Sequence, residues 1–294
     1  MTKYSIEGGY RKDRRWPYFV IGIGVIVLSF GYFAQASFLP AKNQPKTNTA
    51  ELMAEPVTAT PAPKITSSLP WPAYGQAAYG IVNDGVLAQS PKQEDPVPIA
   101  SLAKTITVLA ILKQKPLALG EQGPLITLTE ADEKLFQEYM AKDGTVVPVK
   151  AGVQISEYQA LQAILMPSAN NMSDTLAGWA FGSVEAYNDY ANNMLKELGI
   201  SQTVVADASG YSPDTKSTAS DMVKIGMLYM QDPVLREIAR TPTATIPFAG
   251  VIYNNNTAVN NDGIYGIKVG FTEQANSTFL IAEVDGESKD TVAV

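Results

Sequence analysis

The chain has 294 residues, a net charge of −7, and neither cysteine nor histidine. These absences exclude disulfides, thiol nucleophiles, Ser-His-Asp triads and HExxH metalloprotease sites. Proton transfers in any active site therefore fall to Lys, Asp, Glu, Tyr or water. Residues 16–294 carry 17 basic and 27 acidic side chains, which argues against nucleic-acid binding because phosphate contacts need clustered Lys and Arg.

The N-terminal region predicts a membrane anchor. Residues 1–15 carry five basic and two acidic side chains, and 16–39 form an uncharged apolar stretch long enough to cross a bilayer. The positive-inside bias places the first 15 residues in the cytoplasm. Ala34-Gln35-Ala36 also fits a signal-peptide cleavage site, so cleavage after Ala36 is the alternative. The stretch exceeds a usual signal core, which favours an uncleaved anchor, and both interpretations export the rest of the chain.

Residues 40–66 form a predicted linker, and residues 67–294 a predicted globular domain on the extracytoplasmic side of the cell membrane. The linker contains five Pro, five Thr and five Ala without hydrophobic periodicity. We expect a single-pass membrane protein. The linker suits a domain that works beyond the membrane surface, and a mere spacer is an equally good interpretation.

The globular part begins with a predicted hairpin, in which apolar runs flank Asn83-Asp84-Gly85. Helical periodicity follows at 101–114, 130–140, 156–166, 171–181, 184–198 and 218–230. Strand-like runs are found at 204–206, 244–248, 264–270 and 278–284. Strands at both ends enclose a helical middle, which predicts an α+β fold. The β-prone run 290–294 predicts a C-terminal strand cut in mid-course.

Ser101 and Lys104 form an SxxK pair, three residues apart on the first predicted helix. This spacing places both side chains on one helix face. Lys104 is the one charged residue between Pro96 and Leu112, so the helix should be buried. Burial favours a neutral amine, which can act as a base. The alternative is a helix-capping serine beside a lysine that reaches water.

Two further short motifs are weak signals individually. Ser168 and Asn170 stand between two predicted helices, where a hydroxyl and an amide can point into one cleft; the alternative is a helix N-cap. Lys268 and Gly270 end a predicted strand, where a lysine can hold an anion and a glycine admits a ligand to the backbone. The alternative is a solvated edge-strand lysine.

Taken in order, SxxK, SxN and KxG are the signature set of penicillin-binding proteins and serine β-lactamases. The surrounding sequence resembles the low-molecular-mass penicillin-binding proteins, the serine-type D-alanyl-D-alanine carboxypeptidases. The segments that carry this resemblance are PIASLAKTITVLAIL, VKAGVQISEYQALQAILMPSANN, AYNDYANNMLKELGISQTVVADASGYSPDTKSTASDMVKIG and GIKVGFTEQANSTFLIA. The resemblance runs from about residue 77 to 294.

The resemblance implies an antiparallel sheet flanked by helices, packed against an all-helical subdomain, with the site between them. It also implies a nucleophile at Ser101, a general base at Lys104, a proton relay at Ser168 and substrate positioning by Asn170. The expected substrates are peptidoglycan stem peptides, and β-lactams are expected as covalent inhibitors. No cofactor or metal is implied. The implied substrate-binding residues are Lys268, Val269, Gly270 and Thr272.

Val269 departs from the resemblance, because the family usually has Thr or Ser there. The hydroxyl of that Thr or Ser would bind the terminal carboxylate of the substrate. Its absence argues against strict carboxypeptidase activity and leans slightly toward endopeptidase activity, without deciding between the two. A β-lactamase would need a carboxylate to activate the deacylating water, and no suitable ExxLN-like segment follows Ser168. A catalytically silent wall-binding protein is the alternative outside the enzymes, motivated by Val269 and opposed by the intact Ser101, Lys104, Ser168 and Asn170.

Overall fold

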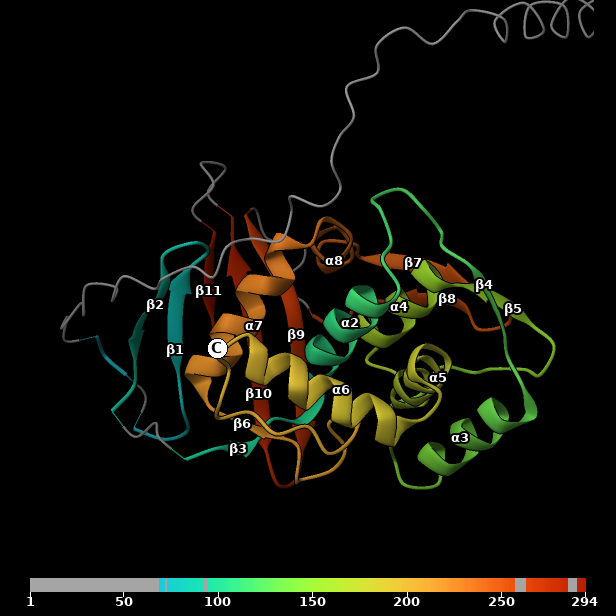
Figure 1. The fold of residues 1–294 in the computed structure, drawn as a ribbon, viewed down its shortest axis with the longest axis horizontal. Coiled ribbons are helices and arrows are strands. Elements are labelled where there is room, and N and C mark those ends of the chain that lie inside the picture. The colour runs from blue at the N-terminus through green and yellow to red at the C-terminus, as the bar shows by residue number, and fades with distance from the viewer. Residues whose placement is uncertain (1–68, 72, 92–94, 257–262, 285–289) are drawn as a thin grey trace, which may run out of the picture. The chain divides into compact units, whose positions relative to one another are not determined.

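The computed structural model describes residues 69–294, apart from 72, 92–94, 257–262 and 285–289 (Figure 1). The predicted cytoplasmic segment 1–15, the predicted anchor 16–39 and the predicted linker 40–66 lie outside the described residues. Among the residues that are described, no helix combines the length and apolarity needed to cross a bilayer.

A five-stranded antiparallel sheet forms one half of the domain. Its strand order is β2-β1-β11-β10-β9, so the last strand of the chain lies between the first hairpin and the β9–β10 hairpin. The predicted turn joins β1 to β2, with Asn83 and Gly85 at φ 75° and 88°. The strands are β1 (Ala78–Ile81), β2 (Gly85–Gln89), β9 (Ile264–Thr272), β10 (Asn276–Glu283) and β11 (Thr291–Ala293).

Helices α7 (Ala219–Gln231) and α8 (Pro233–Ala239) lie against this sheet (Figure 1). Gly226 lets α7 approach closely, because an added Cβ would lie 2.6 Å from a methyl carbon of Val292. Asp232 caps α8 by accepting backbone N–H bonds from Val234 and Leu235. The sheet and these helices share one core, in which Leu280, Ala282 and Val292 are fully buried.

The other half is helical. Its elements are α3 (Glu130–Met140), α4 (Glu157–Leu165), α5 (Asn170–Phe181) and α6 (Val184–Glu197). Capping boxes at Thr129 and Ser156 start α3 and α4. Short antiparallel pairs complete the structure: β3 (Val97–Pro98) with β6 (Lys216–Ser217), β4 (Leu125–Thr127) with β5 (Gln154–Ser156), and β7 (Thr243–Ile246) with β8 (Gly250–Tyr253).

Helix α2 (Ala103–Gln114), preceded by the 3₁₀ turn η1 (Ala100–Leu102), connects the two halves. It contacts α4, α5 and α6 as well as α7. Nine of its 12 residues are buried, as its nearly uniform apolarity predicted. The predicted α+β architecture, with an antiparallel sheet and a helical subdomain, is confirmed.

Candidate active site

The SxxK pair lies where η1 passes into α2. The spacing places Lys104 one turn after Ser101, and Lys104 Nζ donates a hydrogen bond to Ser101 Oγ at 2.9 Å. Ser101 is partly exposed, whereas Lys104 is fully buried. A hydroxyl open to a substrate is thus bonded to an amine that is shielded from water.

Lys104 Nζ has two further acceptors, each at 2.7 Å: Asn170 Oδ1 and the carbonyl oxygen of Ser209. Burial lowers the pKa of Lys104 to about 7, although the carboxylates of Asp207 and Asp174 oppose this shift. A lysine with this pKa is substantially neutral near pH 7 and can accept a proton. As a neutral amine, Lys104 keeps two N–H groups for Asn170 Oδ1 and the Ser209 carbonyl, and these two bonds direct its lone pair toward the hydroxyl of Ser101.

The second motif occupies the turn between α4 and α5. Ser168 is buried and has φ 70°, a left-handed conformation that costs about 1–3 kcal/mol in a non-glycine residue. Backbone bonds hold this turn, from Ala169 N to the Ala163 carbonyl and from Asn170 N to the Thr145 carbonyl. Asn170 then starts α5 and reaches Lys104. The Ser168 side chain makes no hydrogen bond with any residue that the structure describes.

The third motif lies on β9. Lys268 is almost fully buried and donates a hydrogen bond to the carbonyl of Val269 at 2.7 Å. Burial and, next, the nearby charge of Lys104 hold the pKa of Lys268 well below its usual range. A positive charge on Lys104 therefore disfavours protonation of Lys268.

Gly270 brings β9 against the start of the helix. A Cβ added at this glycine would lie 2.7 Å from the backbone nitrogen of Ser101 and 2.7 Å from Thr278 Oγ1. Ala100, just before the serine, has φ 47°. The third motif thus passes so close to Ser101 that only a glycine fits.

A cavity of about 580 Å³ opens at Ser101. Of the predicted site residues, Ser101, Asn170 and Thr272 line it, and Lys104 and Lys268 are buried beside them. Val269 does not line it, but its side chain shares a strand face with Phe271, which does. The other lining residues are Lys142, Asp143, Gly144, Thr145, Gly210, Tyr211, Ser212, Pro213, Glu273 and Gln274.

A network of polar side chains behind Lys104 was not predicted. Tyr139 donates to Asp174 Oδ2 at 2.8 Å and lies 3.3 Å from Ser209 Oγ, which donates to Asp207 Oδ2 at 2.8 Å. Ser209 also supplies the carbonyl that binds Lys104. The spacing of Asn170 and Asp174 was the available signal, since residues four apart share a helix face.

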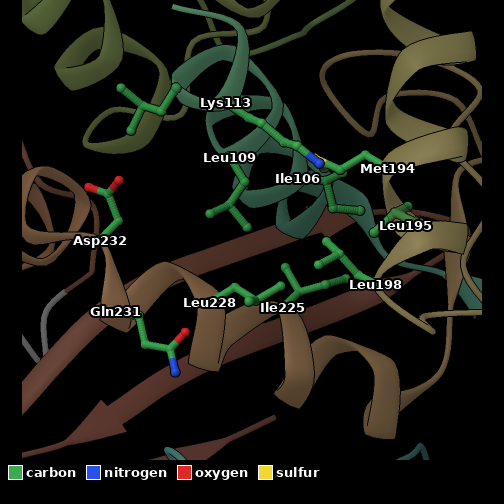
Figure 2. Close-up of a pocket in the computed structure, with 11 residues that line it drawn as sticks. Ile106, Leu109, Lys113, Met194, Leu195, Leu198, Ile225, Leu228, Gln231 and Asp232 are labelled. Carbon is green, nitrogen blue, oxygen red and sulfur yellow. The ribbon is translucent and has the colours of Figure 1, made fainter. Parts of the chain in front are cut away.

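A second cavity, of about 420 Å³, lies between α2, α6 and α7 and is mostly apolar. Figure 2 shows Leu109 of α2 facing Leu228 and Ile225 of α7 across it. None of the predicted site residues lines this cavity. Within the described part of the chain, no three carboxylates are grouped to hold a metal ion.

Comparisons with known proteins agree with this geometry. Residues 82–294 match the D-alanyl-D-alanine carboxypeptidase family. The chain is 31% identical over 237 residues to a D-alanyl-D-alanine endopeptidase of Pseudomonas aeruginosa, covering 78% of this chain and 73% of that one. It is 28% identical to a D-alanyl-D-alanine endopeptidase of Escherichia coli, covering 74% and 70%.

A solved D-alanyl-D-alanine carboxypeptidase from Mycobacterium tuberculosis superposes with a TM-score of 0.67 at 26% identity, covering 78% of this chain and 85% of that one. The resemblance that the motifs carried is thereby confirmed. Since the family match spans most of the chain, the protein belongs to the D-alanyl-D-alanine carboxypeptidase family of serine-type peptidases.

Proposed function

We propose that the protein is a membrane-anchored serine D,D-peptidase that hydrolyses peptidoglycan stem peptides through an acyl-enzyme on Ser101. The observation that supports this most directly is the 2.9 Å hydrogen bond between Ser101 Oγ and Lys104 Nζ. The lysine carries a pKa of about 7, lowered mainly by burial, so it can serve as a base without histidine.

In the proposed acylation, neutral Lys104 takes the hydroxyl proton while Ser101 Oγ attacks the carbonyl carbon of the D-alanine whose peptide bond is cut. The proton then passes to the leaving amine as the C–N bond breaks, with Ser168 as the relay. Asn170 positions both the lysine and the substrate amide. Water later hydrolyses the ester and returns the proton to the hydroxyl of Ser101.

The oxyanion of the tetrahedral intermediate would be held by the backbone N–H of Ser101 and by one of β9. The support is the close approach of Gly270 to the Ser101 nitrogen. Two fixed N–H donors aimed at developing charge supply a large share of acyl-transfer catalysis. Lys268 would bind the carboxylate of the substrate, whose negative charge would favour the protonated form of this lysine.

We infer that endopeptidase action, in which a cross-link is cut, is favoured over release of a terminal D-alanine. Two relatives are named D-alanyl-D-alanine endopeptidases. Val269 offers no hydroxyl to a terminal carboxylate, and Glu273 adds negative charge to the cavity wall. The carboxypeptidase alternative rests on the name of the family and of the Mycobacterium tuberculosis structure.

The membrane anchor remains a proposal from sequence. Residues 16–39 and the basic residues before them support a single crossing with the catalytic domain outside the cytoplasm. Cysteines introduced into residues 1–15 and into the domain test it, because the protein has no cysteine of its own. A membrane-impermeant maleimide on intact cells should label the domain cysteine and spare the N-terminal one, and the reverse pattern contradicts the proposal.

The acyl-enzyme is tested by intact-mass spectrometry of the full chain in detergent, incubated with penicillin. We expect one adduct per chain, which Ser101→Ala abolishes. Ser220→Ala is the matched control, because this serine lies on α7 and bonds Gln89 rather than a lysine. A folded wild-type protein without an adduct would favour a silent wall-binding protein, and rapid loss of the adduct would favour a β-lactamase.

A further inference from the structure

Helix α5 presents two polar side chains toward the buried lysine. Asn170 and Asp174 are one turn apart and therefore share a face of the helix. Asn170 accepts the hydrogen bond of Lys104, and Asp174 acts on the same lysine through its charge, which favours the ammonium form. The segment that carries the SxN motif thus also brings a carboxylate to the proposed base.

Asp174 is incompletely hydrogen-bonded. Oδ2 accepts the Tyr139 hydroxyl at 2.8 Å, whereas Oδ1 is buried and accepts no hydrogen bond from the described residues. A buried carboxylate with a free oxygen is costly, so its presence calls for an explanation. The carboxylate would be explained if it interacted favourably with a cation that forms only during the reaction.

Asp207, the other carboxylate near Lys104, has a different set of partners. It accepts backbone N–H bonds from Ser209, Tyr211 and Ser212 and a hydroxyl bond from Thr215. These contacts give Asp207 a structural role, because they fix the loop that follows it. Among the described residues, Asp174 accepts a hydrogen bond from Tyr139 alone.

We propose that Asp174 is a positioning residue that stabilises the positive charge formed on Lys104 when Ser101 gives up its proton. Tyr139 holds the carboxylate by its hydrogen bond and links it to Ser209, whose carbonyl fixes the lysine. This inference rests on the proposed function, in which Lys104 is the base.

The charged groups around Asp174 and Lys104 set the pH range in which acylation can proceed. Asp174 faces Tyr139 from α3, Asp207 from the loop after α6, Lys104 from α2 and Lys142 from the turn after α3. Lys268 of β9 lies near Lys104. Burial raises the pKa of Asp174 to about 6, and burial lowers that of Lys104 to about 7. Above pH 7 the free enzyme therefore combines a carboxylate with a neutral amine, which is the state that proton transfer requires.

Asp174→Asn should change the pH profile of acylation in two ways. Without the carboxylate, the protonated form of Lys104 is less favoured and its pKa falls. The acid limb, which is the part of the profile where the acylation rate rises with pH, should therefore move to lower pH by about half a unit or more. The same loss weakens the base, so the plateau above pH 8 should also fall, by up to about threefold for each half unit by which the pKa of Lys104 drops. A purely structural defect would lower the plateau and leave the limb in place.

The measurement is the rate of labelling by a fluorescent penicillin from pH 5 to 9, on the full chain, with thermal unfolding as the check of fold. Asp132→Asn is the control for a structural effect: this carboxylate closes the capping box of α3 and bonds Thr175, beside Asp174, but does not contribute to the pKa shift of Lys104. We expect it to leave the acid limb in place.

Tyr139→Phe is a second variant that keeps Asp174. The lost hydrogen bond raises the pKa of Asp174 further, because that bond favours the carboxylate. The acid limb should again move to lower pH, by less than in Asp174→Asn, and the double variant should show no additional movement. This variant keeps the inference testable if Asp174→Asn does not fold.

An acid limb that stays in place in both folded variants overturns the role of Asp174, while the proposed function stands. If the wild-type protein is not labelled at Ser101, or if labelling shows no acid limb near pH 7, the proposed function itself fails. The two failures are therefore distinguishable in one data set.

Discussion

Gly270→Ala probes the contact between β9 and η1, the turn that carries Ser101. The added Cβ would lie 2.7 Å from the Ser101 nitrogen, whereas non-bonded heavy atoms rest at roughly 3.5–4.0 Å. The strand or the helix start must therefore shift by about 1 Å. Such a shift removes the alignment of the Ser101 N–H with the oxyanion, and loss of one such donor costs about 10²–10³ in rate. We expect acylation by penicillin to fall by that factor.

The matched control is Gly178→Ala on α5, where an added Cβ meets no atom within 4 Å. Alanine is favoured over glycine in a helix interior by about 1 kcal/mol, so this variant should unfold at a higher temperature and acylate normally. The assay is the second-order rate of fluorescent-penicillin labelling, with near-ultraviolet circular dichroism as the check of tertiary structure. A folded Gly270→Ala protein that acylates within about twofold of the wild-type rate would refute the oxyanion geometry.

Three other substitutions test the site and its surroundings. In Lys104→Arg the arginine cannot release its proton at working pH, so acylation should fall by orders of magnitude in a folded protein. A normal labelling rate would mean that another residue is the base. Val269→Thr should raise D-alanine release from peptides with a free terminal carboxylate by about one to two orders of magnitude; an equal effect on amidated peptides would mean that position 269 does not bind the carboxylate. Burial raises the pKa of Glu157 to about 7, so its charge destabilises the fold increasingly as pH rises from about 4.5 to 7. Urea unfolding should then show Glu157→Gln gaining on the order of 1 kcal/mol over wild type at pH 8 and little at pH 4.5, and an equal difference at both pH values would contradict this.

Local sequence signals predicted much of the domain. The helix predicted at 130–140 is α3 with the same bounds, and the predicted hairpin at Asn83-Asp84-Gly85 joins β1 to β2. These elements were accessible because caps, turn residues and periodicity act over a few residues. The motif residues Ser101, Lys104 and Asn170 also meet as the resemblance implied.

Other features depend on contacts that a linear pattern does not contain. The strand predicted at 204–206 was wrong: only Val204 forms a bridge, with Lys216. Helix α8 was missed, although Asp232-Pro233 is a typical helix N-terminus, with an N-cap aspartate followed by proline. The network of polar side chains formed by Tyr139, Asp174 and Asp207 was missed because its members lie on separate segments that only the tertiary fold brings together.

The central place of β11 has a consequence for folding kinetics. Tyr79 pairs with Ala293, from the opposite end of the domain's sequence, while α4, α5 and α6 follow one another through short connections. Closing so long a loop loses chain entropy before the contacts between β1 and β11 can stabilise the fold. We therefore expect the helices to form before β11 pairs with β1. Until β11 pairs, β1 and β10 each expose an unpaired edge that other chains can join. The partly folded protein is therefore most prone to aggregate at the last step of its assembly.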